Sequence, residues 1–130
     1  MTDSVVVSAA AARRAAEAIL TARGVPPADA EVVARNLVAA DLRGIDTHGL
    51  FCLIEYAHAV GDRRINPTPA IAIERTLPWA IRVDGDNGLG PLVAERAMDA
   101  VLETVETMGI AMATVRNANH YGAAAVYIER

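Results

Sequence analysis

The chain of 130 residues contains no lysine, because all twelve of its basic residues are arginine. No lysine side chain can therefore form a Schiff base with a carbonyl substrate, which excludes one route to covalent catalysis. Cysteine is almost absent as well. The single Cys52 excludes a disulfide within the chain and is typical of a reducing compartment, so we expect a cytoplasmic location.

Aromatic residues and long apolar runs are also scarce. One Trp, three Tyr and one Phe leave most of the core to Val, Ile, Leu and Met. No run approaches the roughly 18 apolar residues of a transmembrane helix, and no basic segment precedes an apolar one, so we expect neither a membrane span nor a signal peptide. The net charge of −4 argues against a nucleic-acid partner, because such binding depends on neutralising phosphates.

The first half of the chain has a helical pattern. Apolar and alanine positions recur at helical spacing over residues 5–22 and 27–42, and the pattern resumes from 49 to about 60. Glycine or proline follows each of these stretches. We therefore predict a three-helix N-terminal segment, and place its boundary at residues 1–66.

The second half, residues 67–130, changes period. Residues 70–74 and 80–84 alternate as strands do, residues 91–108 form an amphipathic helical pattern, and the apolar run 110–115 is typical of a central strand. A strand, a helix and a second strand of these lengths indicate a crossover unit. The predicted fold class is α/β (α+β), with a partial mixed sheet after the helical lead-in.

A glycine-rich stretch, Asp84–Pro91, precedes the amphipathic helix. Backbone N–H groups at a helix start can hold a phosphate, but the spacing of Gly85, Gly88 and Gly90 does not match the dinucleotide-binding pattern. The alternative is a tight turn in which Asn87 and Gly88 supply positive φ angles. We favour the tight turn.

Thr47 and His48 stand where the third helix should start. A hydroxyl beside an imidazole offers a proton relay, because histidine is the usual acid or base near neutral pH. Alternatively, Thr47 or Asp46 is a helix N-cap and His48 packs on the helix. The residues alone slightly favour this structural alternative, because adjacent side chains do not face each other on a helix.

His120 follows the apolar run 110–115 in a glycine-containing loop. The carboxyl ends of strands in open sheets are common ligand sites, so we favour a functional histidine over one bonded only to backbone. We expect His120 and the Thr47–His48 pair to belong to one active site, with His58 on the surface. Cys52 is a possible nucleophile only if its pKa is lowered. No pair of ligands has metal-binding spacing, so we expect no metal site.

Four motifs occur in order along the chain. They are Ala40-Asp-Leu-Arg-Gly-Ile-Asp-Thr-His-Gly49 with Tyr56, then Ile65-Asn-Pro67, Asp84-Gly-Asp-Asn-Gly-Leu-Gly90 and Val115-Arg-Asn-Ala-Asn-His-Tyr-Gly-Ala-Ala124. Together they resemble the malate/L-lactate dehydrogenase family that lacks a Rossmann fold. Its relatives include sulfolactate and ureidoglycolate dehydrogenases and piperideine/pyrroline-2-carboxylate reductases.

The resemblance implies an oxidoreductase that uses NAD or NADP. Its substrate would be a small 2-hydroxy or 2-oxo carboxylate, or a cyclic imino acid. Thr47 stands for the serine of the family's Ser-His relay, His48 matches its histidine, and His120 matches a histidine beside substrate and nicotinamide. The residues that carry over as cofactor-contacting are His120, Tyr121, Gly122, Ala123 and Ala124.

On the substrate side, Cys52 occupies the position of an arginine that usually clamps the carboxylate in this family. A thiol offers neither charge nor a bidentate fork, and losing such a clamp costs about 2–5 kcal/mol when nothing replaces it. Arg43 is the nearest substitute, and Tyr56 completes the predicted substrate-binding set.

Members of this family are more than twice as long, and the resemblance implies a homodimer. We therefore expect the chain to be truncated and weakly active or inactive alone. The alternatives are a non-catalytic remnant or interaction module that completes a site with a complementary chain, and a stand-alone binding protein for small carboxylates.

Overall fold

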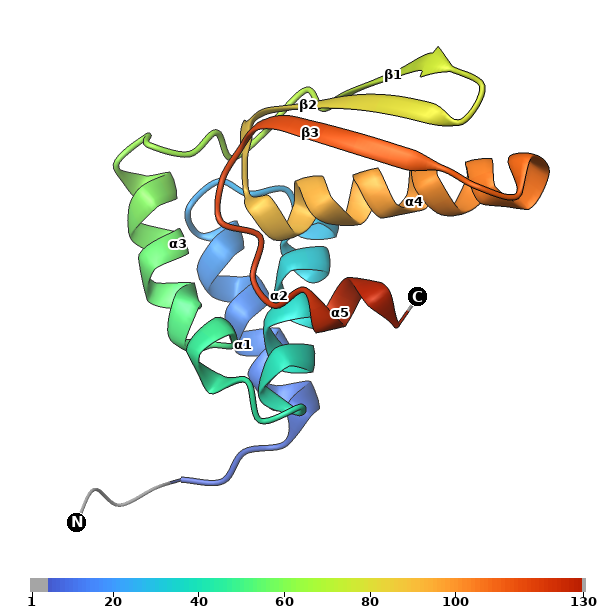
Figure 1. Cartoon of the computed structure of the whole chain (residues 1–130). Coiled ribbons are helices and arrows are strands. Elements are labelled where there is room, and N and C mark those ends of the chain that lie inside the picture. Colours follow the sequence, from blue (N-terminus) through green and yellow to red (C-terminus); the bar gives the residue numbers. More distant parts are fainter. Residues whose placement is uncertain (1–4, 130) are drawn as a thin grey trace.

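A computed structural model describes residues 5–129 of the chain (Figure 1). The elements in order are α1 (Ala9–Thr21), α2 (Pro27–Asp41), the 3₁₀ turn η1 (Asp46–His48), α3 (Phe51–Gly61), β1 (Ala72–Leu77), β2 (Ala80–Gly88), α4 (Gly90–Met108), β3 (Met112–Ala118) and α5 (Ala125–Ile128). Three helices therefore precede a sheet with a crossover helix. The predicted fold class is confirmed.

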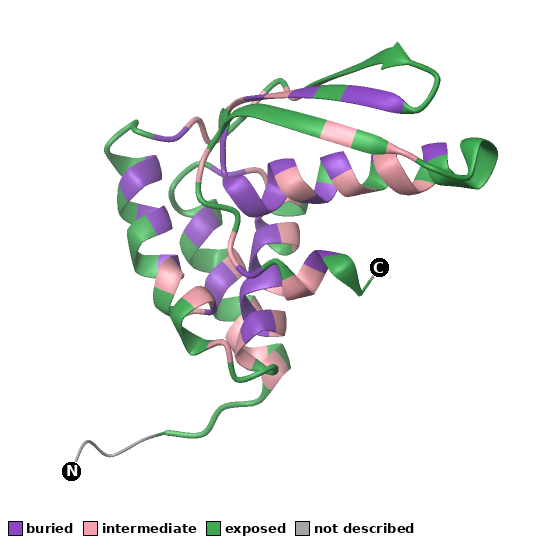
Figure 2. Cartoon of the chain, in the orientation of Figure 1, coloured by how far each residue is buried: buried purple, intermediate pink, exposed green. Residues whose placement is uncertain are grey.

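The sheet has the strand order β1-β2-β3. β1 and β2 are antiparallel, whereas β2 and β3 are parallel and joined through α4, so the sheet is mixed. The prediction of 110–115 as a central strand is wrong, because β2 holds the centre and β3 lies at an edge. No described strand pairs with the outer side of β3, which leaves Met112 51% and Val115 46% exposed (Figure 2).

The glycine-rich stretch is only partly a turn. β2 continues through it to Gly88, and its register with β3 shifts between Asp84 and Gly88. Asp86 and Asn87 take positive φ angles of 48° and 56°, so the irregularity is a bulge in a strand. The Asp86 carboxylate accepts a hydrogen bond from the N–H of Ala70, and so ties the bulge to the preceding link.

One face of the sheet packs on α4, which runs beneath it (Figure 1). Ile81 and Val83 of β2 are buried against Val93, Ala97 and Ala100 of α4. A larger core cluster joins α1, α2 and α3, and the start of α4 contributes Leu89 and Leu92 to it. Packing thus crosses the proposed boundary after residue 66, and that boundary remains a prediction.

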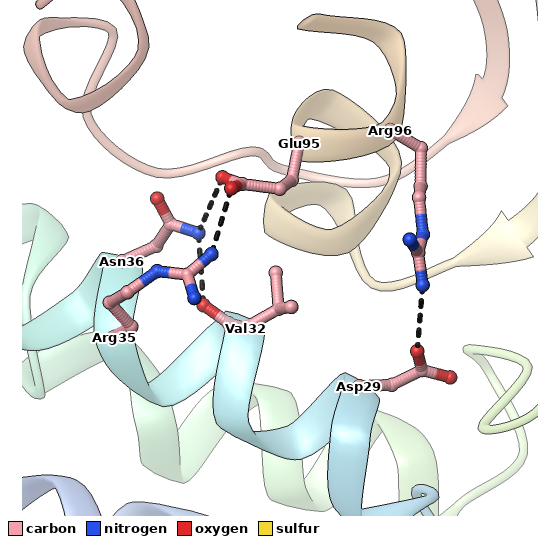
Figure 3. Close-up of polar contacts among 6 residues, drawn as sticks. All are labelled: Asp29, Val32, Arg35, Asn36, Glu95 and Arg96. Carbon is pink, nitrogen blue, oxygen red and sulfur yellow. Dashed lines mark hydrogen bonds and ion pairs between the residues drawn. The ribbon is translucent and has the colours of Figure 1, made fainter. Parts of the chain in front are cut away.

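A buried carboxylate connects α4 to α2. Glu95 accepts hydrogen bonds from Arg35 at 2.7 Å and from the side-chain amide of Asn36 at 3.3 Å (Figure 3). The Glu95 side chain is 11% exposed, so its charge is stabilised by these donors and little by water. A second ion pair between the same helices, Arg96 to Asp29, spans 3.7 Å and leaves the Arg96 side chain 49% exposed.

The first residue of α4, Gly90, also constrains the fold. A Cβ atom on Gly90 would overlap the carbonyl oxygens of Asn119 and His120. The helix start and the loop after β3 therefore lie backbone against backbone, and only glycine fits between them. This contact holds the His120 loop against the rest of the fold.

The two ion pairs predict unequal stability effects. Replacing Glu95 with Ala removes the carboxylate partner of Arg35 and one of the two acceptors of the Asn36 amide, which keeps the carbonyl oxygen of Val32. We expect a loss of about 2 kcal/mol in the free energy of unfolding. Arg96→Ala is the matched control, because an exposed pair contributes about 0–1 kcal/mol. Urea denaturation followed by circular dichroism measures both values. Equal losses would contradict the role assigned to the buried carboxylate.

Gly90→Ala tests the close approach. We expect it to cost about 1–3 kcal/mol of stability, because two backbone segments must move apart. Gly61→Ala is the control, since the nearest atoms there belong to the flexible Arg23 side chain and alanine is the better helix former. Thermal unfolding of the two variants compares them directly. An unchanged melting temperature for Gly90→Ala would refute the constraint.

Candidate functional site

Thr47 and His48 lie on η1, between α2 and α3. The predicted helix start at residue 49 is wrong, because α3 begins only at Phe51 and neither Asp46 nor Thr47 caps it with a side chain. Instead, the Asp41 carboxylate accepts a hydrogen bond from the N–H of Leu50 at 3.0 Å.

Asp41 also explains the glycine of the Thr-His-Gly motif. A Cβ atom on Gly49 would overlap the Asp41 carboxyl group, so a side chain here would displace that carboxylate from the N–H of Leu50. The last turn of α2 therefore fixes the entry to α3, and with it the turn that carries His48. Sequence reasoning missed Asp41, although it lies within the motif that carries the resemblance.

The Thr47 hydroxyl lies 2.8 Å from Nδ1 of His48. The objection that neighbouring side chains point apart does not apply here, because the pair lies on a single 3₁₀ turn and not within an α-helix. Thr47 is exposed and His48 is half-buried, so the imidazole is accessible on one side. The contact expected of a relay is therefore present, while the relay role remains a prediction.

His120 comes next to His48 although 72 positions separate the two in sequence. Their ring centroids lie 5.4 Å apart, and the Tyr56 ring lies 6.1 Å from that of His120. The neighbouring Asn119 donates from its side-chain amide to the carbonyl oxygens of Asn87 and Gly88, which anchors the loop to the end of β2. η1, α3 and the loop after β3 thus converge on two imidazoles.

Tyr56 supplies the buried side of this group. Its hydroxyl contacts Nδ1 of His120 at 2.8 Å and the carbonyl oxygen of His120 at 3.2 Å. Burial raises the pKa of Tyr56 well above its usual value, with smaller contributions from Cys52 and Tyr127. The phenol therefore stays protonated and neutral at any physiological pH.

Cys52 is half-buried one turn before Tyr56, and its Sγ donates to the carbonyl oxygen of Thr47 at 3.3 Å. Burial raises the pKa of the thiol, and the Asp41 carboxylate raises it further. At neutral pH the group is therefore a neutral thiol. The possible nucleophilic role of Cys52 depended on a lowered pKa, and the opposite shift argues against it.

Arg43, the predicted substitute for the missing clamp, is engaged elsewhere. Its guanidinium forms an ion pair with Glu129 and donates to the carbonyl oxygen of Ala39 at 2.8 Å. The Arg43 partner lowers the pKa of the Glu129 carboxyl. Arg43 would have to leave Glu129 to reach a substrate, so the substrate-binding role of this residue is still untested.

A cleft of about 610 Å³ lies between β3, α4 and α5. Of the predicted cofactor residues, Tyr121 and Ala124 line it, together with Gly90, Val93, Ala97, Met98, Val101, Val115, Asn117, Asn119 and Tyr127 among others. Ala123 is buried, while Gly122 has a φ of 80° and lies beside His48. Sequence reasoning missed Tyr127, whose hydroxyl donates to the carbonyl oxygen of Tyr121.

The residues of this cleft fit part of a dinucleotide. The lining is mostly apolar and includes two tyrosines and two asparagine side chains, which suits a flat ring with polar edges. Its one basic side chain, Arg116, is paired with Asp84 at 2.9 Å, so the described residues offer less to a pyrophosphate.

Among residues 5–129, no three His, Cys, Asp or Glu side chains gather as a metal site would require. The helices within this range are too short or too polar to cross a membrane.

The profile of the family described as malate/L-lactate dehydrogenase matches residues 7–130. Malate dehydrogenase from Pyrococcus horikoshii is 41% identical over 109 residues, which cover 84% of this chain and 30% of that protein. L-sulfolactate dehydrogenase from Methanocaldococcus jannaschii is 38% identical over 111 residues, covering 85% and 32%. Ureidoglycolate dehydrogenase (NAD(+)) from Escherichia coli K12 is 30% identical over 101 residues, covering 78% and 29%.

Solved structures agree with these sequence matches. The chain superposes on the Pyrococcus horikoshii malate dehydrogenase with a TM-score of 0.91 at 37% identity, covering 95% of this chain and 35% of that one. The Methanocaldococcus jannaschii sulfolactate dehydrogenase gives a TM-score of 0.92 at 34% identity, covering 96% and 36%. The chain spans about a third of the length of these relatives, and both its sequence and its fold place it in the malate/L-lactate dehydrogenase family.

Proposed function

We propose that the chain supplies the proton-transfer wall of a nicotinamide-dependent oxidoreductase acting on a small carboxylate. The substrate is a 2-hydroxy or 2-oxo acid or a cyclic imino acid, and the cofactor is NAD or NADP. One observation carries the proposal. In a chain of this family, His48 and His120 lie with ring centroids 5.4 Å apart, and each has its Nδ1 within 2.8 Å of a hydroxyl group.

The nicotinamide, when bound, gives or takes a hydride at the substrate carbon. His120 is exposed and would exchange a proton at the substrate oxygen or nitrogen, as a histidine can near neutral pH. Thr47 extends His48 into a second proton path. Tyr121 and Ala124 hold the cofactor from the wall of the cleft, and His120, Gly122 and Ala123 complete that contact.

The substrate carboxylate requires a cationic partner, and Cys52, at the position where one is expected, does not supply it. Cys52 is a neutral thiol, and the guanidinium of Arg43 is bound to Glu129. The hydroxyl of Tyr56 is occupied by His120, so it reaches a substrate only by leaving that ring. We propose that the carboxylate is bound by Arg43 after release from Glu129, or by a cation on another polypeptide.

A second candidate function is an interaction module. It is favoured by the outer edge of β3, with which no strand in residues 5–129 pairs. Met112 and Val115 of this strand and Ile110 just before it expose apolar surface there. This edge and the neighbouring cleft would accept a second copy of the chain or a complementary chain that completes the site. Mixing the chain with the separately expressed C-terminal two thirds of the Pyrococcus horikoshii enzyme tests this candidate. Failure of the two to co-elute would count against it.

We predict little or no turnover by the 130-residue chain alone, because Cys52 offers no charge to the substrate carboxylate and Arg43 is bound to Glu129. NADH and NADPH oxidation followed at 340 nm with pyruvate, oxaloacetate and piperideine-2-carboxylate measures this. Rapid turnover of any of these would show that the site is complete as it stands.

A fusion provides the direct test of the proposed function. The chain would replace the matching first third of the Pyrococcus horikoshii malate dehydrogenase, and oxaloacetate reduction would be measured. We expect an active enzyme in which His48→Gln or His120→Gln lowers kcat by about 10²–10⁴-fold, the usual contribution of general acid–base catalysis.

His58→Gln is the matched control for the fusion. His58 is exposed on α3 and takes part in none of the hydrogen bonds found among the site residues, so this variant should keep the activity of the parent fusion. A folded but inactive parent fusion, or equal losses in all three histidine variants, would contradict the proposed function.

A further inference from the structure

The hydroxyl of Tyr56 touches two atoms of one residue, and this carries a consequence for the proton on His120. The phenol oxygen lies 2.8 Å from Nδ1 of the imidazole and 3.2 Å from the main-chain carbonyl oxygen of the same residue. Both distances are within hydrogen-bonding range. Tyr56 is 4% exposed, so water offers its hydroxyl little alternative.

Only one placement of the protons makes each contact a separate, two-centre hydrogen bond. A carbonyl oxygen can only accept, and a phenol has one proton, so the hydroxyl proton of Tyr56 must point at the carbonyl of His120. The phenol oxygen then presents only lone pairs to the imidazole. Nδ1 of His120 must therefore carry a proton and donate it to Tyr56.

The opposite arrangement, in which Tyr56 donates to Nδ1 of His120, is less stable. If Tyr56 donated to Nδ1, its oxygen lone pairs would face the lone pairs of the carbonyl oxygen at 3.2 Å, and the carbonyl would lose its donor. The carbonyl oxygen would then exchange a hydrogen bond for a repulsive contact between lone pairs. A deprotonated tyrosine would avoid the choice, but burial holds this phenol in its protonated form.

We propose that Tyr56 is a positioning residue that fixes neutral His120 as the Nδ1–H tautomer and so leaves Nε2 as the ring nitrogen that takes up and returns a proton. No hydrogen bond joins Nε2 to any residue of the described chain, and His120 as a residue is exposed. When Nε2 is protonated, Nδ1 keeps its proton and its bond to Tyr56. The same hydrogen bonds thus serve both protonation states, and no group has to rotate between them.

The catalytic meaning of this tautomer rests on the proposed function, but the tautomer itself does not. It can be measured on the 130-residue chain with ¹⁵N-labelled histidine, by long-range ¹H–¹⁵N correlation at roughly pH 8.5, two units above the usual histidine pKa. Loss of a signal in His48→Gln, His58→Gln or His120→Gln assigns each ring. We expect wild-type His120 to show a protonated Nδ1 and an unprotonated Nε2.

Tyr56→Phe removes the hydroxyl and keeps the ring. His120 should then shift to the Nε2–H form that free histidine prefers. Tyr127→Phe is the matched control, because Tyr127 is similarly buried and also donates to a main-chain carbonyl, but it has no hydrogen bond to His120. The control should leave the His120 tautomer unchanged.

Three outcomes would overturn the inference. They are an Nε2–H tautomer in the wild type, an Nδ1–H tautomer that persists in Tyr56→Phe, and a shift of equal size in Tyr127→Phe. If Tyr56→Phe does not fold, the wild-type spectrum alone decides. An Nδ1–H tautomer in a chain whose fusion tolerates His120→Gln would uphold this inference and refute the proposed function, so the two failures are distinguishable.

Discussion

The site depends on one contact between two stretches of backbone. α4 starts where the loop after β3 returns, and the missing side chain of Gly90 lets the helix reach the carbonyl groups of Asn119 and His120. Leu89 and Leu92 beside it are buried in the core shared with the first three helices. The position of His120 is therefore set by the main chain and the core together.

The two neighbouring imidazoles have the same kind of hydrogen-bond partner. His48 has its Nδ1 against the Thr47 hydroxyl, and His120 has its Nδ1 against the Tyr56 hydroxyl. Their surroundings differ, because Thr47 is exposed whereas Tyr56 is buried. The Thr47 hydroxyl can exchange its partner with solvent, while that of Tyr56 is restricted to His120.

Much of this architecture could be predicted from local pattern. Helical spacing and alternation gave the order of the elements, and the crossover between β2 and β3 followed from their lengths. The edge position of β3 could not be read from its apolar residues, because hydrophobicity shows that burial is required but not which surface provides it. The entry to α3 was also mispredicted, since its N–H acceptor is Asp41, nine positions before Leu50 and on another helix.

In the candidate site, too, local sequence predicted some features and missed those that depend on residues far apart in the chain. The residue types of Thr47, His48 and His120 pointed to acid–base chemistry, and their order along the chain carried the resemblance. The sequence led us to expect these residues in one site, but the distances between them depend on how the chain folds. The engagement of Arg43 with Glu129 had no local signal, because 86 positions separate the two residues.

The ion pair between Arg43 and Glu129 makes the cleft sensitive to salt concentration. α5 has only four residues, and one of its supports is the bond from Glu129 to Arg43 at the end of α2. Both side chains are substantially solvent-exposed, so dissolved ions weaken their attraction, with a screening length of about 8 Å at physiological ionic strength. Tyr127 and Ile128 line the cleft from this helix. A low salt concentration therefore strengthens the ion pair that holds α5, and a high salt concentration loosens this wall of the cleft.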